Sequence, residues 1–485
     1  MSRVLENIEP KAVFNFFEDM TQIPRCSGNE KAISDYLVDF AKKRKLEVIQ
    51  DKALNVIIKK PGTKGYENAP TVILQGHMDM VCEKNKDTNH DFSTEPLKLR
   101  VENDMVMATG TTLGADNGIA VAYALAILDS DEISHPPLEV LITTDEETGM
   151  EGANNLDSNN LKGKILINID SEEEGTLLVS CAGGIRNIIS LPIEWNRCPD
   201  GYIAFDLRVR GLKGGHSGME INKERGNSNI MLGRILKGIS DNIDIYLAEI
   251  SGGAKMNAIP RESDAVILVD PKDKYKVVEE ISEWNKVIGN ELKTADPDVR
   301  IELELSNTTF DKVFSKVTME KVLAGLALIP NGVQTMSVEI EGLVQSSTNL
   351  GVLITNEKEV LLECAIRSSV STLKFDIVKK MEALANLIGA SSSNEGDYPA
   401  WEYRKDSYIR EVFVNTYKRV YGEEPIITAI HAGLECGLFD EKLDNVDMIS
   451  LGPNMYDVHT PNERVSISST NRVWEYLVES LKSIK

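Results

Sequence analysis

The sequence predicts an α/β protein: a mostly parallel, mixed sheet with helices on both faces, interrupted by an inserted α+β domain. Three observations predict this fold class. Short apolar runs alternate with helical patterns in residues 1–189 and again in 399–485. Polar residues follow directly where these runs end, as in parallel sheets that carry ligands there. Between them, residues 190–398 change to longer alternating strands. We therefore expect a catalytic domain in two parts, 1–189 and 399–485, around a lid domain, 190–398.

Composition limits the function classes. The chain has 485 residues and a net charge of −23, and 42% of its residues are hydrophobic. Such a chain is long enough for two or three packed units. Its acidic surface repels nucleic acid and anionic membranes, so we expect no partner of either kind.

The distribution of the cysteines and the first residues of the chain indicate the cellular compartment. The six cysteines are scattered without a C-x-x-C pair, which argues against a disulfide scaffold and against a thiolate zinc site. The first ten residues contain no apolar segment of the kind found in secretory signals, and no run reaches membrane-spanning length. We expect a cytoplasmic protein in a reducing compartment.

The first part of the chain should contain two helices and then strands separated by a buried helix. The helices are expected at 11–25 and 29–45, and a strongly apolar helix at Ile119–Leu128. The expected strands are Leu46–Ile49, Asn55–Lys59, Val72–Leu74, Leu138–Thr143 and Ile165–Ile169.

The lid domain could consist of two related α/β halves, because a similar order of elements recurs in it. Strands are expected near 203–209, 245–250, 263–269, 338–355 and 359–366, and helices near 227–239, 273–293 and 373–389. The segment Ser391–Asp397 is rich in turn-forming residues and is interpreted as a return loop. The catalytic domain then resumes with helices at 408–421 and 469–484 and strands at Ile426–Ile430 and Val446–Leu451.

A set of metal-binding residue types lies at the ends of the predicted α/β elements. Two imidazoles and three carboxylates suit two zinc-like ions with one shared carboxylate. The set consists of His77, Asp116, Glu147, Asp170 and His459. Asp116 is our predicted bridge, because the glycines flanking its loop allow a close approach of the backbone. Asp79 lies two residues after His77, on the same face of an extended strand, and should orient its ring.

Simpler interpretations compete with this one. Asp116-Asn-Gly118 alone is typical of a turn, and an adjacent glutamate pair is usually solvated. We assign Glu147 to metal and Glu146 to general base, although the sequence cannot separate them. His90 and His135 are expected to be structural, and His431 is open between a structural and a pocket-lining role. His216, between glycines, is favoured for a catalytic or oxyanion-binding role.

Several motifs together carry a resemblance to a known family. They are Gly76-His-Met-Asp79, Gly114-Ala-Asp-Asn-Gly118, Asp145-Glu-Glu-Thr-Gly149, Asn168-Ile-Asp-Ser-Glu-Glu-Glu-Gly175, Gly214-Gly-His-Ser-Gly218, Asn257-Ala-Ile-Pro-Arg261 and His431-Ala-Gly-Leu-Glu-Cys-Gly437. The chain resembles, nearly end to end, the di-zinc peptidase superfamily that includes aminoacylase, carboxypeptidase G and peptidase T. The Ser-Glu-Glu-Glu-Gly and His-Ala-Gly-Leu-Glu-Cys-Gly runs resemble its branch of Xaa-His dipeptidases.

The resemblance implies roles for individual residues. It implies two divalent ions, zinc first and manganese or cobalt as alternatives, on the five ligands above, with Asp116 bridging. It also implies Glu146 as base, Asp79 as the residue that tunes His77, and His216 as a stabiliser of the tetrahedral intermediate. Asn257 and Arg367 match positions that hold the substrate's carboxylate end, and we assign Glu435 to its amino end. Asp145 departs from the pattern, where a threonine was expected.

The function implied is hydrolysis of small dipeptides, Xaa-His and β-alanyl-histidine included. An N-acyl amino acid deacylase or desuccinylase with the same metal site is the first alternative, and a non-catalytic metal-binding interaction protein is the second. In this family a lid histidine acts across a homodimer or, with a double-length lid, within one chain. The sequence leaves open whether His216 acts in cis or in trans, and so leaves open a homodimer.

Overall fold

The computed structural model describes residues 3–485 and divides into two compact units. Among the described residues, the first unit consists of 3–180, 403–429 and 434–485, and the second of 181–402 and 430–433. The units therefore change at 180/181 and 402/403, against expected domain limits of 189/190 and 398/399. The second unit also receives a short segment, 430–433, that the sequence analysis had placed in the catalytic domain.

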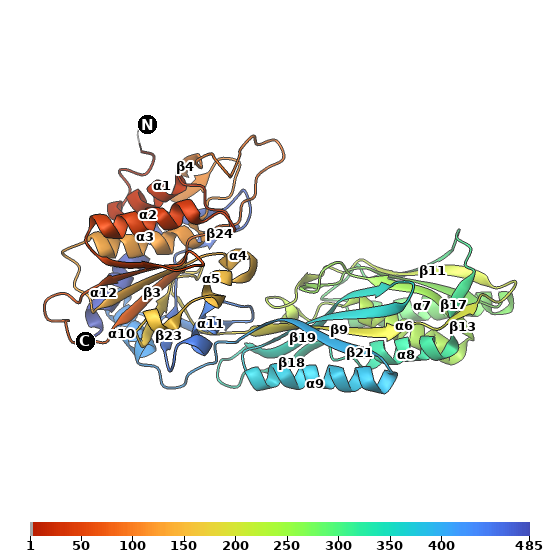
Figure 1. Cartoon of the computed structure of the whole chain (residues 1–485). Helices are drawn as coiled ribbons and strands as arrows, with labels where there is room; N and C mark the ends of the chain where they lie inside the picture. Colours follow the sequence, from red (N-terminus) through yellow and green to blue (C-terminus); the bar gives the residue numbers. More distant parts are fainter. Residues whose placement is uncertain (1–2) are drawn as a thin grey trace. The chain divides into compact units, whose positions relative to one another are not determined.

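A mixed sheet forms the centre of the first unit (Figure 1). Its strands run in the order β1 (Glu47–Gln50), β2 (Val56–Lys60), β6 (Leu138–Thr143), β3 (Val72–His77), β7 (Ile165–Asn168), β23 (Asp447–Ser450), β8 (Thr176–Cys181) and β22 (Ile426–Ile430). The central neighbours β6, β3, β7 and β23 are parallel, whereas β1, β2 and β8 pair in antiparallel fashion. This confirms the predicted fold class. β3 is buried along its whole length, as expected for a parallel strand covered on both faces.

Helices cover both faces of this sheet (Figure 1). One face packs against α1 (Lys11–Thr21), α2 (Lys31–Lys43), α3 (Ala115–Asp129), α10 (Tyr408–Tyr421) and α12 (Ile467–Ser483) in one apolar core. The other carries α5 (Glu151–Asn154) and α11 (Glu435–Lys442). The short helices α4 (Glu146–Gly149) and η1 (Ser158–Asn160) belong, like α5, to the connection between β6 and β7. A small sheet with the order β24 (Met455–Tyr456), β25 (Arg464–Ser466), β5 (Met105–Ala108) and β4 (Leu99–Glu102) completes the unit.

The second unit contains one long antiparallel sheet. Its strands run in the order β16 (Arg300–Leu305), β11 (Ile203–Arg210), β15 (Ser263–Val269), β13 (Ile245–Gly252), β19 (Val344–Thr355), β20 (Glu359–Ser368), β9 (Gly183–Pro192) and β21 (Ser391–Tyr398), and β18 (Gly332–Met336) pairs with β19. Helices α6 (Ser228–Asn242), α7 (Lys274–Glu291), α8 (Lys316–Leu328) and α9 (Ser371–Ile388) share one apolar core with it. The remaining short elements are β10 (Trp195–Arg197), β17 (Lys312–Phe314), β12 (Gly215–His216), β14 (Ala258–Ile259), η2 (Ile221–Lys223) and η3 (Pro271–Asp273).

This long sheet has an internal repeat. The order β16-β11-β15-β13 corresponds to β21-β9-β20-β19. Along the chain, both halves have one helix between the first and second matched strands and another between the third and fourth: β11-α6-β13-β15-α7-β16 and β9-α8-β19-β20-α9-β21. The first half is inserted between β9 and α8, and the halves meet through the pair Gly252↔Leu353. The two α/β halves suggested by element order thus have a counterpart in strand topology.

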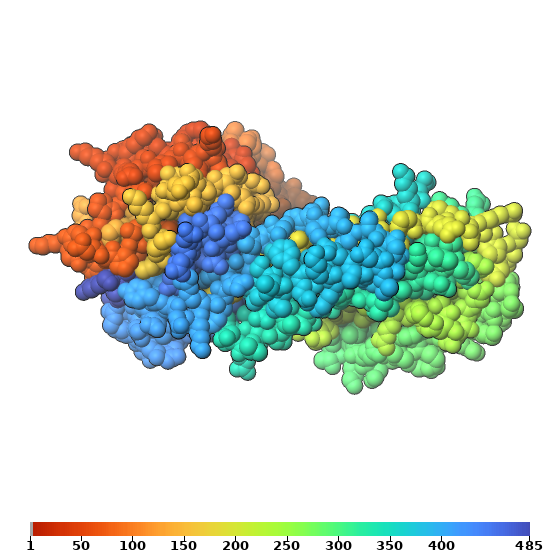
Figure 2. Space-filling view, turned by 60° about the horizontal axis from the view of Figure 1, so that its bottom comes forward, coloured from red at the N-terminus to blue at the C-terminus, as the bar shows by residue number. Residues whose placement is uncertain are grey.

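Several sequence-based expectations were wrong in detail. The first helix ends at Thr21, because Pro24 follows closely and disfavours a helical residue before it. Ser391–Tyr398 is not a return loop but the edge strand β21, paired with β9. Tertiary pairing outweighs a serine-rich composition that is unfavourable for strands. α9 and β21 lie at the surface of the second unit on the face shown in Figure 2, in light blue.

The cysteine analysis missed a disulfide. Cys26 and Cys82 are bonded, with 5.7 Å between their Cα atoms and a sequence separation of 56. The sequence analysis argued against a disulfide scaffold and did not identify this single pair, because the spacing of two cysteines does not reveal that separate turns meet in space. Among the helices of residues 3–485, none combines the length and apolar character that crossing a membrane requires.

Candidate metal centre and substrate-binding residues

The structure brings the five predicted metal ligands together at one edge of the first unit's sheet. His77 ends β3, Asp170 follows β7, and Glu147 follows β6 in α4. Asp116 begins α3, and His459 lies in the loop between β24 and β25. Because the parallel strands all end at this edge, residues distant in sequence converge there.

Asp116 lies between the two imidazoles. Its Oδ1 is 3.3 Å from His77 Nε2, and its Oδ2 is 3.1 Å from His459 Nε2. Each imidazole also faces a second carboxylate: Asp170 Oδ1 is 3.6 Å from His77 Nε2, and Glu147 Oε2 is 2.9 Å from His459 Nε2. The arrangement offers two neighbouring positions, each with one imidazole, one terminal carboxylate and one oxygen of Asp116.

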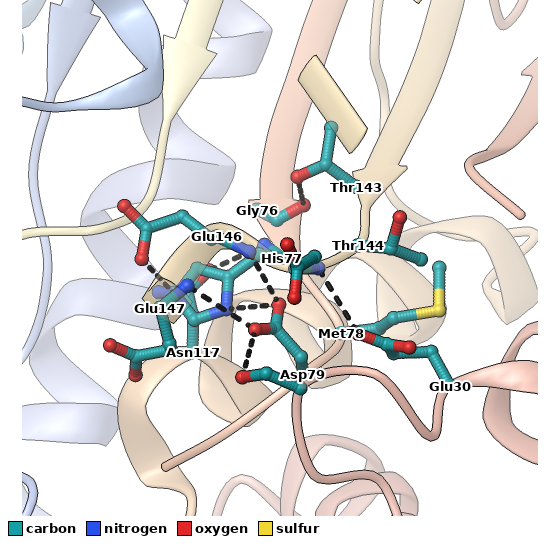
Figure 3. A network of polar contacts seen from close by, with 12 residues as sticks. Glu30, Gly76, His77, Met78, Asp79, Asn117, Thr143, Thr144, Glu146 and Glu147 are labelled. Carbon is teal, nitrogen blue, oxygen red and sulfur yellow. Dashed lines mark hydrogen bonds and ion pairs between the residues drawn. The ribbon is translucent and has the colours of Figure 1, made fainter. Parts of the chain in front are cut away.

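Asp79 connects His77 with the glutamate pair (Figure 3). Its side chain is fully buried, and Oδ1 lies 3.2 Å from His77 Nδ1. Oδ1 also accepts the backbone N–H of Glu146 at 3.1 Å, and Oδ2 accepts that of Glu147 at 3.3 Å. The hydroxyl of Ser27 donates to Oδ2 at 2.8 Å. One carboxylate therefore fixes the ring of His77 and the backbone of both glutamates.

The contacts of the glutamate pair differ. Glu147 reaches His459 Nε2 with both carboxylate oxygens, at 3.0 and 2.9 Å. The nearest imidazole nitrogen to Glu146 is His77 Nε2, at 3.9 Å from Oε2. Glu147 thus shares its imidazole with Asp116 and fits a ligand, whereas Glu146 lies at the margin of the cluster and fits a base.

The cluster is electrostatically strained without a cation. Although burial lowers the pKa of His77, its hydrogen bonds to Asp116, Asp170 and Asp79 outweigh this and raise the pKa well above 6.5. Burial and the neighbouring carboxylates raise the pKa of Asp170 to about 6, and burial raises that of Glu146 well above its usual value. Protons and imidazolium charge are the available compensation for the crowded carboxylates.

The donor set fits a pair of divalent ions. Three groups have ligand atoms within 4.8 Å of one another: His77–Asp116–Asp170, His77–Glu146–Glu147 and Asp116–Glu147–His459. Imidazole nitrogen with carboxylate oxygen is a donor combination that zinc accepts. Two dications would neutralise the carboxylate excess that otherwise raises the pKa values.

His216, Asn257 and Arg367 all lie in the second unit. His216 belongs to β12, opposite Ala258 of β14, so Asn257 is adjacent to it across this short ladder. The backbone N–H groups of Gly218 and Met219 both point to His216 Nδ1, at 3.3 and 3.0 Å. A backbone N–H can only donate, so Nδ1 is unprotonated and the proton of the neutral ring is on Nε2. The ring can therefore donate one hydrogen bond from Nε2.

Gly218 marks where three residues of the second unit meet, one through its backbone and two through their side chains. A Cβ atom on it would lie 2.3 Å from the carbonyl oxygen of His431, 3.1 Å from His216 Cε1 and 3.2 Å from Arg367 Cδ. His431 Nε2 is 2.7 Å from Ser347 Oγ. Burial and the positive charge of Arg367 lower the pKa of His431 to about 3, so its ring is neutral. His431 thus lies in the same group as the predicted substrate residues.

Glu435 is fully buried in the first unit at the start of α11. Its Oε2 accepts hydrogen bonds from Gln75 Nε2 at 2.6 Å and Thr143 Oγ1 at 2.8 Å. Burial and the nearby Asp170 raise its pKa to about 8, despite the opposing effect of His77. Its assignment to the substrate's amino end stays a prediction. Asp145, the departure from the family pattern, accepts a hydrogen bond from Thr148 Oγ1.

Sequence reasoning missed residues that hold the site in place. Asn349 Nδ2 donates to the carbonyls of Met256 and Ala258, at 3.0 and 2.8 Å, and so fixes the backbone on both sides of Asn257. Glu174, in the acidic run after Asp170, pairs with Arg472 and has a structural role. Asn349 ends the polar run Gln345-Ser-Ser-Thr-Asn349 within β19, so no local pattern distinguished it from its neighbours.

Comparison with protein families identifies one match. The model of "Peptidase family M20/M25/M40" matches residues 73–483. Among curated proteins, a cytosol non-specific dipeptidase of Escherichia coli K12 is 39% identical over 482 residues, covering 99% of both chains.

Two solved structures resemble this chain to different degrees. An aminoacylhistidine dipeptidase from Vibrio alginolyticus is 40% identical and superposes with a TM-score of 0.95, covering 100% of this chain and 98% of the other. An aminopeptidase PepT from Bacillus cereus superposes with a TM-score of 0.56 at 15% identity, covering 98% of this chain and 99% of the other, which is a likeness of fold alone.

Proposed function

Since the chain belongs to peptidase family M20/M25/M40, a family of peptide-bond hydrolases, we propose that it is a metal-dependent dipeptidase that prefers Xaa-His substrates, β-alanyl-histidine included. The observation that carries the metal dependence is Asp116, whose two carboxylate oxygens face two different imidazoles. We assign two divalent ions, zinc first, to His77, Asp170, Glu147 and His459 with Asp116 as the bridge.

The chain's own residues perform most of the reaction. Bound divalent ions supply polarisation of the scissile carbonyl and a lower pKa for water. Glu146 takes the proton of the attacking water and passes it to the leaving amine. His216 donates its Nε2–H to the developing oxyanion. Arg367, with Asn257 beside His216, pairs with the free carboxylate of the substrate. Recognition of that carboxylate favours short peptides with a free C-terminus.

Substrate breadth is the part of the proposal that needs a direct measurement. The two similar full-length relatives carry different descriptions, non-specific in one case and aminoacylhistidine in the other. The assay is hydrolysis of β-alanyl-histidine, Ala-His, Ala-Leu, Gly-Gly, N-acetyl-histidine and N-succinyl amino acids, after chelation and again with zinc, manganese or cobalt. We expect metal-restored cleavage of free dipeptides, fastest for Xaa-His. Cleavage of only the acylated substrates would replace the proposal by a deacylase.

A matched variant separates catalysis from metal binding. Glu146→Gln keeps the size of the side chain and should retain the metal but lose hydrolysis of every substrate. Equal hydrolysis by this variant and the wild type would exclude Glu146 as the base. No hydrolysis by the wild type with any metal would favour a non-catalytic metal-binding protein.

We also propose a cytoplasmic location, supported by the description of the E. coli relative. The Cys26–Cys82 disulfide is the feature that argues against a reducing compartment. Alkylation of the protein's thiols directly in lysed cells, followed by mass determination, shows whether this pair is reduced in place.

A further inference from the structure

Glu463 is a buried carboxylate that binds the loop carrying Asp116. It lies four residues after His459, between β24 and β25, and is 2% exposed. Its Oε2 accepts the backbone N–H groups of Leu113 at 2.7 Å and Gly114 at 3.0 Å. Its Oε1 accepts those of Ala115 at 2.7 Å and Asp116 at 3.4 Å. Four successive N–H groups therefore point to one side chain from a distant part of the sequence.

This contact takes the place of a local helix cap. The first N–H groups of a helix lack intrahelical acceptors, and a negative charge near them is stabilising. The residue before α3 is Gly114, which has no side chain to act as a cap. Glu463 supplies the acceptors and the negative charge instead.

Arg25 holds the same loop from the other side. It is 2% exposed, and its Nη2 donates to the carbonyl of Gly114. Its Nη1 donates to the carbonyls of Met78 at 2.9 Å and Asp79 at 3.1 Å. Gly114 has a φ of +68°, and a Cβ atom there would lie 2.5 Å from Nη2. The glycine of the Gly114–Gly118 motif is therefore needed for the close approach of Arg25.

We propose that Glu463 and Arg25 are positioning residues that hold Asp116 so that both of its carboxylate oxygens face an imidazole at once. This rests on the proposed bridging role of Asp116. Glu463 ties the Asp116 loop to the loop of His459, and Arg25 ties it to the turn of His77 and Asp79. A carboxylate that binds two metal ions tolerates little displacement, because any movement toward one imidazole increases its distance from the other.

The test is the metal affinity of Glu463→Gln. The amide keeps the shape, but its NH₂ group faces backbone donors, so two of the four acceptor contacts are lost. We expect zinc and manganese to bind at least tenfold more weakly, as is usual when a residue that orients a ligand is changed. Affinity is measured on the metal-free, folded protein by competition with a chromophoric chelator, independently of activity. For β-alanyl-histidine at saturating metal, kcat should fall while KM changes less than twofold.

Glu139 provides the matched control. It is 3% exposed, and its Oε2 accepts the backbone N–H groups of Lys162 at 2.7 Å and Gly163 at 2.9 Å. It lies near the start of β6, at the opposite end of that strand from Glu146. Glu139→Gln should lower the unfolding temperature like Glu463→Gln but leave metal affinity within twofold of the wild type.

The outcomes are distinguishable. If Glu463→Gln binds metal as tightly as the wild type while Asp116→Asn does not, the positioning role is wrong and the metal site stands. If the wild type binds no metal, the proposed function itself fails. Should Glu463→Gln not fold, Glu463→Asp and Arg25→Lys keep the charge and carry the same test. Weakened metal binding in these folded variants supports the inference, and unchanged binding in both overturns it.

Discussion

The hydroxyl of Tyr398 accepts a hydrogen bond from Arg367 Nη1 at 3.0 Å, and it does so across Gly184. Arg367 on β20 and Tyr398 on β21 are both register partners of Gly184 on β9. A Cβ atom on Gly184 would lie 2.4 Å from the phenol oxygen, so only glycine leaves room for this contact. Tyr398 thus fixes the guanidinium of Arg367, the group that we propose binds the substrate carboxylate.

Tyr398→Phe should therefore weaken substrate binding. Loss of one hydrogen bond to a charged group costs about 1.5–3 kcal/mol, which corresponds to an increase in KM for dipeptides of roughly tenfold or more. We expect kcat and metal affinity to change little. Tyr246→Phe, whose ring packs against Tyr202 in the same unit, is the control and should keep the wild-type KM. An unchanged KM in Tyr398→Phe would show that Arg367 is positioned without this contact.

Asp79→Asn should disturb three groups at once. The neutral amide removes the charge beside His77 and offers only one acceptor to the N–H groups of Glu146 and Glu147. We expect metal affinity to fall by about 10–100-fold, with a loss of kcat in the metal-saturated enzyme. Ser27→Ala removes only one of the contacts to Asp79 and should have a much smaller effect. Equal effects of the two substitutions in a chelator competition would contradict this ranking.

His216→Ala should lower kcat without changing metal affinity. Loss of one oxyanion donor typically costs about 10²–10³ in kcat, and KM should change far less. Mixing His216→Ala with Glu146→Gln then decides between cis and trans. Recovery of activity in the mixture requires His216 of one chain to serve the site of another. Absence of recovery from subunits shown to exchange would indicate cis action.

The pH dependence of stability should carry the signature of His431. Its pKa is about 3 in the folded protein against 6.5 for an ordinary histidine, so the unfolded state binds more protons between these values. The free energy of unfolding therefore falls as the pH drops below 6.5. From pH 7 to pH 5 the loss from this group is about 2 kcal/mol.

His431→Gln isolates this contribution. Within residues 3–485 the buried Nδ1 of His431 has no hydrogen-bond partner, so protonation would bury an unpaired N–H. The variant should lose less stability than the wild type between pH 7 and pH 5 in denaturant titrations of the metal-free protein. His90→Gln is the control, because that histidine already has Glu95 beside Nδ1 at 3.4 Å. If the free energy of unfolding fell equally with pH in His431→Gln and in the wild type, His431 would not be the source of this pH dependence.

The strand ends and the metal-binding residue types could be predicted from sequence, because apolar runs are local and parallel strands end at one edge. The inserted position of the second unit followed from the change in pattern after residue 190. The edge strand β21 could not be predicted, since its pairing with β9 outweighs a composition typical of turns.

The missed positioning residues share one property. Arg25, Asn349 and Glu463 act on backbone groups far away in sequence, and no local motif marks such a partner. Tyr398 was missed because its role depends on Gly184, its register partner on β9, which lies far earlier in the chain. Glu435 was identified from its motif alone. Its partners in the structure are Gln75 and Thr143, and its contact with the substrate's amino end stays a prediction.

Residues 430–433 return to the second unit, and this limits where the protein can be cut into fragments or recombined with a relative. Ile430 and Ala432 both accept the N–H of Ala182, at 3.1 and 3.0 Å, and His431 contacts Ser347. A fragment of residues 181–402 would contain His216, Asn257 and Arg367 but would lack these partners. A chimera between relatives must therefore exchange residues 181–402 and 430–433 together. If only 181–402 were exchanged, His431 of one protein would have to pack against residues around Ser347 that come from the other protein.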